Sequence, residues 1–172
     1  MNRNLSTSPI DTEQIDVIIA DKYRELIVSL DKSLAQVMFT YEQLQAANKK
    51  GPLSYIYISW LRSSAMLDLP LIRIDLYDQR GYMDLEECYV SWDIDCVTSE
   101  ISQPCNSINQ KDRPTPRTEY ENEKAWMNIV EKICKTLEKH IVHVLENITI
   151  EKSICDTKIY YGEFLDKTVQ IR

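Results

Sequence analysis

Three aspartates between residues 71 and 97 have the spacing of a small metal site. Asp93 and Asp95 are two residues apart, and Asp75 lies on the alternating segment that precedes them. Side chains two apart on a β-strand share a face, and a hairpin would bring Asp75 to that same face. Converging carboxylates bind Mg²⁺ or Mn²⁺ through oxygen. One hypothesis is therefore a metal-dependent enzyme that acts on a small or phosphorylated substrate.

The rest of the chain lacks what such metal chemistry usually requires. The three glycines, at positions 51, 81 and 162, are too far apart to form a phosphate-binding loop. No predicted strand carries a lysine two residues after an acid, as a D…E-x-K nuclease would. A solvated acidic face, with Arg73 and tyrosines as neighbours, explains the same carboxylates without a metal.

The two histidines offer a second possible metal site. His140 and His143 stand three residues apart on a predicted helix, and Glu146 follows three residues later. Residues three or four apart share a helix face, so these side chains could ligate one metal. The Glu-x-x-His signature of two-metal helical bundles is absent, because position 137 is leucine. The apolar stripe of the helix favours the simpler interpretation, in which His140 packs and His143 lies at the rim.

Covalent catalysis has little support in the sequence. No G-x-S-x-G motif occurs. Cys134 and His140 are six residues apart on one predicted helix and cannot form a nucleophile–base pair with each other. We therefore predict no catalytic residue.

Aromatic residues form the last candidate group, with ten tyrosines, three tryptophans and two phenylalanines. Several lie in or beside the predicted sheet. Rings with a polar edge are frequent in strands and also at protein interfaces. Together with the acidic residues they predict a binding surface on the sheet. Its expected members are Arg73, Asp75, Tyr77, Tyr89, Trp92, Asp93 and Asp95.

The alternation of residues 71–97 predicts the hairpin that positions these side chains. In the first arm, apolar residues at positions 72, 74 and 76 alternate with polar or aromatic ones at 73, 75 and 77. On the return arm, positions 90, 92, 94 and 96 are apolar and the positions between them are mostly polar. The segment Asp78–Gly81 supplies turn residues. We expect an antiparallel pair with one face in the core and one facing water.

Two long amphipathic helices are expected on either side of the hairpin, at about residues 11–49 and 119–147. Asp11 and Gln14 have the spacing of a capping box, and the segment 48–52 has the composition of a helix end. The apolar stripe of the first helix is broad. We therefore expect one side of residues 15–44 to face the core and the other to face a partner.

The remaining segments are less regular. Residues 1–10 and 98–117 are polar, which predicts a flexible terminus and a long loop. Residues 53–66 begin as an alternating strand, and their second half is either irregular or helical. The tail from residue 151 contains two short alternating pieces that could add edge strands.

Length, charge and cysteine content restrict the class of protein. A chain of 172 residues favours a single domain, 1–172. With 27 acidic and 20 basic residues the net charge is −7, which argues against a nucleic-acid partner. No apolar run is long enough for a membrane span, and residues 1–14 lack the core of a signal peptide. Five cysteines without a C-x-x-C pair predict free thiols and a cytoplasmic location.

These observations predict an α+β protein with an antiparallel sheet centred on the hairpin at about 71–97 and packed against the two helices. We expect a non-enzymatic cytoplasmic module for protein interaction or regulation, with a protein partner or self-association and no cofactor. A metal-dependent enzyme remains an alternative, as does a small-molecule sensor with a pocket between helix and sheet.

Overall fold

The computed structural model describes residues 10–62, 71–106, 119–149, 154 and 156–172. Within them the chain is α+β, as predicted. The elements, in order, are α1 (Thr12–Asp21), α2 (Tyr23–Ala46), β1 (Tyr55–Trp60), β2 (Ile72–Tyr77), the 3-10 turn η2 (Gly81–Met83), β3 (Tyr89–Trp92), α3 (Asp95–Asn106), α4 (Glu119–Glu146), β4 (Lys158–Glu163) and β5 (Thr168–Gln170).

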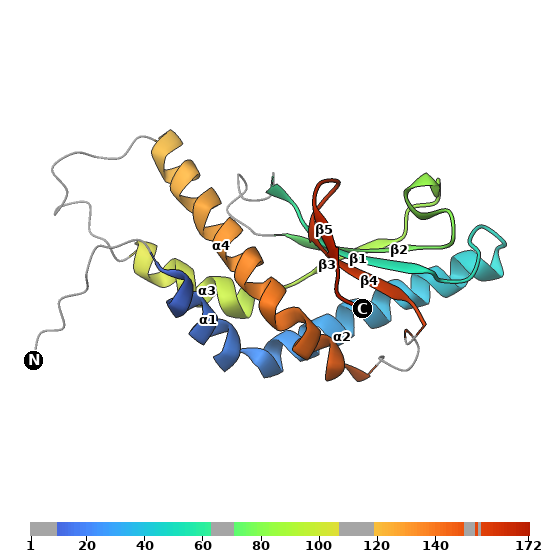
Figure 1. Cartoon of the computed structure of the whole chain (residues 1–172), viewed down its shortest axis with the longest axis horizontal. Coiled ribbons are helices and arrows are strands. Elements are labelled where there is room, and N and C mark those ends of the chain that lie inside the picture. Colours follow the sequence, from blue (N-terminus) through green and yellow to red (C-terminus); the bar gives the residue numbers. More distant parts are fainter. Residues whose placement is uncertain (1–9, 63–70, 107–118, 150–153, 155) are drawn as a thin grey trace, which may run out of the picture.

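The strands form one sheet in the order β3-β2-β1-β4-β5, with α2 running along it (Figure 1). All neighbouring strands are antiparallel except β1 and β4, which are parallel. The expectation of a purely antiparallel sheet centred on the hairpin is therefore wrong. The chain between β1 and β4 includes two helices, which is the kind of long crossover that parallel pairing requires. β1 is the central strand, and the hairpin of β2 and β3 occupies one end of the sheet.

The register of the hairpin is as predicted as far as Trp92. Ile72 lies opposite Trp92, and Ile74 lies opposite Val90, so the apolar positions of both arms share one face. Beyond Trp92 the prediction is wrong, because β3 ends there and α3 begins at Asp95. The carboxylate of Asp93 accepts the backbone N–H of Asp95 at 2.7 Å. This local bond favours a turn over continued pairing.

The predicted first helix is in fact two helices. Asp11 caps α1 through the expected capping box with Gln14. Lys22 then interrupts the helix, with φ −97° and ψ 11°, before α2 begins. The interruption allows α1 to pack on α4 while α2 follows the sheet. The second predicted helix, at about residues 119–147, agrees with α4.

Three other expectations need correction or lie outside the described chain. The first part of the predicted loop 98–117 is helical, since α3 extends to Asn106; residues 107–118 are not described. β4 is an interior strand, so only β5 is the edge strand that the tail was expected to add. Residues 1–9 and 63–70 lie outside the described chain, and the single-domain prediction stays a prediction.

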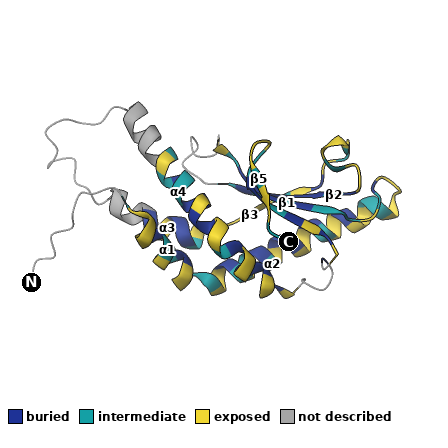
Figure 2. Cartoon of the chain, in the orientation of Figure 1, coloured by how far each residue is buried: buried dark blue, intermediate teal, exposed yellow. Residues whose placement is uncertain are grey.

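One face of the sheet and the facing sides of the helices form the core, as the burial pattern in Figure 2 shows. Ile56, Ile58 and Trp60 of β1 point into it, with Ile72, Ile74 and Leu76 of β2 beside them. Among the described helices, none is long and apolar enough to cross a membrane. The pleat of the strands separates the buried face of the sheet from a second face, which lies opposite α1 to α4.

A buried ionic network joins the two loops at one end of the sheet. The side chain of Lys50 is fully buried; it forms an ion pair with Asp84 and donates to the carbonyl of Leu76 at 3.3 Å. Arg80 bridges the two acids of the network, at 3.1 Å from Asp84 and 2.7 Å from Asp78. We call Lys50, Asp78, Arg80 and Asp84 the loop network.

The loop network also fixes the backbone that follows α2. Asp78 accepts the N–H of Gly51 at 2.9 Å, and the hydroxyl of Tyr41 donates to the carbonyl of Gly51 at 3.1 Å. Hydrogen bonds from Arg80 and from the Gly51 N–H hold the pKa of Asp78 well below its usual value. The connection from α2 to β1 is thus bonded to the connection from β2 to β3.

Replacing Lys50 by methionine is expected to lower the free energy of unfolding by about 3 kcal/mol, because the buried charge of Asp84 then has only Arg80 and the backbone N–H of Glu86 as partners. Urea unfolding would measure it. The matched control is Lys49→Met, which removes an exposed lysine 3.6 Å from Glu86 and should cost less than about 0.5 kcal/mol. Equal unfolding midpoints for the two variants would contradict the role given to Lys50.

The low pKa of Asp78 makes its contribution depend on pH. A carboxyl whose folded-state pKa is lowered stabilises the protein above its ordinary pKa and loses that contribution as the pH falls through the folded value. Asp78→Asn should therefore be less stable than the parent protein at about pH 7, and the difference should shrink below about pH 4. Urea titrations across this range test this, and a difference that stays constant on acidification would refute it.

Candidate functional site

The candidate site is the sheet face opposite the helices, which we call the open face. The register places alternate residues of β1 to β4 on it. Its members are Tyr55, Tyr57, Ser59, Arg73, Asp75, Tyr77, Tyr89, Ser91, Lys158 and Tyr160. Most of these residues are partly buried or exposed, whereas Ser59 and Asp75 are buried. The face is rich in aromatic rings and poor in aliphatic side chains.

Three tyrosines of the open face, Tyr57, Tyr77 and Tyr160, pack together with Tyr82 of η2, which lies against the same face. We call these four residues the tyrosine cluster. Tyr57 stacks on Tyr160 with ring centroids 4.8 Å apart and an angle of 10° between the rings. Its distances to the rings of Tyr77 and Tyr82 are 5.7 and 4.7 Å, and those two rings are 5.3 Å apart. Rings this close leave no room for a cation between them, so the cluster is a packed surface rather than an aromatic cage.

The hydroxyl groups of Tyr57, Tyr77 and Tyr82 stay protonated at neutral pH, because their pKa values are raised. Burial raises the pKa of Tyr77 to about 12, and it also raises the pKa values of Tyr57 and Tyr82. A protonated phenol both donates and accepts hydrogen bonds. The cluster therefore offers a rigid apolar surface with neutral polar groups at its edge.

Arg73 and Asp75 form an ion pair beside the cluster. The Nε of Arg73 donates to Asp75 at 2.8 Å, and its Nη2 lies 2.6 Å from the same carboxylate. The guanidinium lies 3.7 Å from the ring centre of Tyr89 and 5.1 Å from that of Phe164. Burial raises the pKa of Asp75, which is 2% exposed, and Arg73 opposes that shift. The carboxylate of Asp75 is thus paired with Arg73.

The structure does not bring the three predicted carboxylates together. Asp75 lies opposite Tyr89, whereas Asp93 and Asp95 are exposed and follow the other end of β3. Asp93 is four positions along the chain from Tyr89, a span of about 13 Å for extended backbone. In the part of the chain that the structure describes, no group of three or more His, Cys, Asp or Glu side chains could hold a metal.

Trp92 is not part of the open face. Its side chain is 1% exposed, faces α2, and donates from Nε1 to the Ser29 hydroxyl at 2.9 Å. The prediction that Trp92 belongs to the binding surface is therefore wrong. Residues two apart on a strand share a face, so Trp92 lies on the apolar face with Val90. Tyr77 and Tyr89 do lie on the open face, with Tyr89 50% exposed.

Sequence reasoning did not assign Tyr57, Tyr160, Lys158 and Phe164 to the site. The Tyr55-x-Tyr57 alternation on β1 was a visible signal. The contribution of β4 was not, because nothing local shows that residues 158–163 pair with residues 55–60. Tyr160 therefore joins the tyrosine cluster through a contact between segments about a hundred residues apart.

His140 connects three helices rather than binding a metal with His143. Its Nε2 lies 2.8 Å from the carboxylate of Asp16 on α1, and its Nδ1 is hydrogen-bonded to the hydroxyl of Tyr23 on α2. His143 is exposed, packs edge-on against the Tyr23 ring, and lies 3.9 Å from Glu146. Asp16 and Tyr23 flank the break between α1 and α2, so this contact stabilises the bend.

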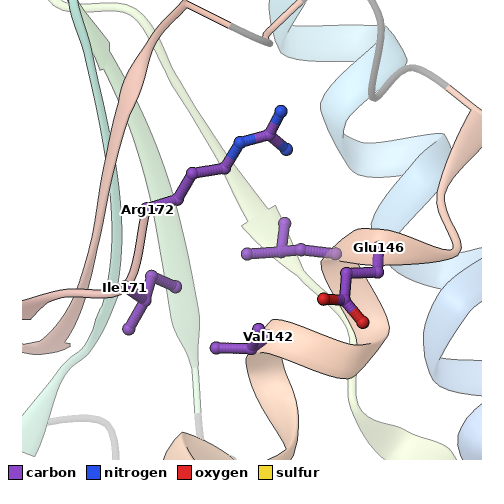
Figure 3. Close-up of a pocket in the computed structure, with 5 residues that line it drawn as sticks. Val142, Glu146, Ile171 and Arg172 are labelled. Atoms are coloured by element: carbon purple, nitrogen blue, oxygen red, sulfur yellow. The ribbon is translucent and has the colours of Figure 1, made fainter.

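An open groove lies between α4 and the chain after β5 (Figure 3). It is lined by Val142, Leu145, Glu146, Ile171 and Arg172 and has a volume of about 360 Å³. Its lining is mostly apolar with one acid and one base. The groove lies on the helix side of the molecule, away from the tyrosine cluster.

Comparison with known proteins assigns neither a family nor a function to the chain. No family model, no curated protein and no solved structure matches the chain. The function must therefore be argued from the chain's own residues.

Ser59 is the one described residue with a buried side-chain oxygen or nitrogen that has no hydrogen-bond partner. It lies in the open face between Arg73 and Gly162 of the neighbouring strands. Leaving a buried hydroxyl without a partner costs roughly 1–3 kcal/mol. The unpaired hydroxyl of Ser59 therefore lowers the free energy of unfolding of the protein.

Replacing Ser59 by alanine should raise the free energy of unfolding by about 1 kcal/mol, because the unpaired hydroxyl is removed and little volume is lost. Thermal and urea unfolding measure the change. Ser91→Ala, on the same face but exposed, is the matched control and should have almost no effect. A loss of stability in the Ser59 variant would mean that the hydroxyl has a partner.

Proposed function

We propose that the chain is a non-enzymatic, cytoplasmic protein-interaction module that binds its partner through the open face. The observation that carries the proposal is the tyrosine cluster, in which Tyr57 packs against three other rings on the sheet face opposite α1 to α4. Tyrosine and arginine are enriched at the energetic centres of protein interfaces. Here both types lie together, with Arg73 held between Tyr89 and Phe164.

The packing of the cluster favours binding for an entropic reason. Immobilising a flexible side chain at an interface costs about 0.5–1.5 kcal/mol. Tyr57 already contacts three other rings, and Arg73 is already held by Asp75 and two rings. These side chains have little freedom left to lose, so more of the contact energy is available for affinity.

The charge of the face supports a protein partner over a nucleic acid. Its charged side chains are Arg73, Lys158, Asp75 and the neighbouring Glu87, so the positive and negative charges balance. Phosphate backbones require a concentrated positive surface. A neutral aromatic surface with polar edges matches the core and rim of a protein interface.

The alternatives have weaker support. Asp75 is paired with Arg73, and His140 is bonded to Asp16 and Tyr23, so neither predicted metal set has its ligands free to converge. The groove of Figure 3 could accommodate a small molecule, but no buried polar group points to a ligand class there. The cytoplasmic assignment is supported by Cys88 and Cys134, which are buried free thiols whose pKa values burial raises to about 11 and about 12.

The test compares two patches of exposed hydrophobic side chains. Tyr82→Ser with Tyr89→Ser removes the two most exposed rings of the open face, 48% and 50% exposed. Val28→Ser with Phe39→Ser alters the outer side of α2, the other predicted partner surface. We expect the immobilised parent chain and the α2 variant to retain the same proteins from a lysate of the source cells, and the open-face variant to lose them.

Circular dichroism and the melting temperature establish that both variants fold. The retained proteins are identified by mass spectrometry, and hydrogen exchange of the complex should show protection of β1 and β2. Loss of binding in the α2 variant instead would place the interface on α2. Unchanged binding in both variants would reject the open face as a protein-binding site.

A further inference from the structure

We propose that the occupant of the open face is a second copy of the same chain, which faces the first across a two-fold axis parallel to the strands. This inference rests on the proposed function, because it names the partner of the same face. It is carried by the order of four residues in one row across the sheet. The row is Glu87, Tyr77, Tyr55 and Lys158.

The hydrogen-bond register establishes that row. Tyr55 lies opposite Tyr77 on β2 and opposite Lys158 on β4. Asp75 lies opposite Tyr89 on β3, and the N–H of Leu76 donates to the carbonyl of Cys88 at 2.9 Å. Pairing thus continues to Cys88, one residue before β3, and we infer from this register that Glu87, the next residue outward, lies level with Tyr77.

The two ends of the row carry opposite and accessible charges. The Glu87 side chain is 73% exposed, and its carboxylate lies 3.8 Å from Nη2 of Arg73. Lys158 is exposed, with its ammonium 6.0 Å from the ring centre of Tyr55. An acid at one end and a base at the other, with two tyrosines between them, is a self-complementary sequence of groups.

A two-fold axis between two facing sheets, parallel to the strands, reverses such a row. Glu87 of one copy then faces Lys158 of the other, and symmetry repeats the pair at the opposite end. Tyr77 faces Tyr55 in the same way. Tyr82, which contacts Tyr57 on β1 and Tyr77 on β2, lies near the axis and would meet its counterpart.

The charge of the whole chain favours this face over others for self-association. Each copy carries a net charge of −7, so two copies repel each other across most of their surfaces. The open face has balanced charges and therefore offers the approach with the least repulsion. Opposed charges across it add attraction and specify the orientation.

The area of the face predicts a weak dimer. Four strands about 4.8 Å apart provide only a few hundred Å² per copy. A standard stable interface buries roughly 800 Å² per partner. We therefore expect a concentration-dependent equilibrium between monomer and dimer rather than a permanent assembly.

Charge reversal tests the pairing directly by sedimentation equilibrium of the full chain. Lys158→Glu and Glu87→Lys should each weaken self-association about tenfold or more, because each places like charges opposite one another twice. Mixing the two variants should restore a 1:1 dimer, since both cross-copy pairs are again of opposite charge. Lys139→Glu and Glu138→Lys, on exposed positions of α4, are the controls for net charge and should leave self-association unchanged.

The outcomes separate this inference from the proposed function. A parent chain that stays monomeric at all concentrations, or a dimer that the reversals do not weaken, overturns the inference. The inference is also overturned if a mixture of Lys158→Glu and Glu87→Lys forms no 1:1 dimer. If the parent chain is monomeric but retains another protein through the open face, the proposed function stands and only the identity of the partner changes.

Discussion

The contact on which the rest of the sheet depends is the buried ion pair of Lys50 and Asp84. A buried charge is costly unless it is paired and hydrogen-bonded, and here Arg80, Asp78 and the carbonyl of Leu76 complete the set. Because Lys50 follows α2 and Asp84 follows β2, the pair joins two loops that are far apart in sequence. It fixes where β1 begins and where η2 lies, and η2 carries Tyr82 onto the open face.

The open face follows from this arrangement. The helices occupy one side of the sheet, so the pleat divides each strand between a core and an uncovered face. Rings of β1, β2 and β4 meet there because the parallel pairing of β1 with β4 places Tyr57 opposite Tyr160. Arg73 completes the surface by pairing with Asp75, which removes that carboxylate from any metal chemistry.

Sequence reasoning succeeded where the deciding interaction is local. The alternation in residues 72–77 predicted which side chains of β2 are buried, and the Asp11 capping box predicted the start of α1. It was wrong at Asp93 and Asp95, because a side-chain bond to the backbone ends β3 two residues after Val90. It was also wrong at Trp92, where membership of the apolar face should have outweighed the general preference of tryptophan for interfaces.

By itself the sequence determined the class of fold, the pleat of β2 and β3, and the extent of α4, since each depends on periodicity within one segment. Only the tertiary structure decided that β4 lies beside β1, that Lys22 divides the first helix, and that His140 bonds to Asp16 and Tyr23. These features depend on contacts between segments distant along the chain. Periodicity states which face of a segment is apolar, but it does not state which other segment will cover that face or lie beside it.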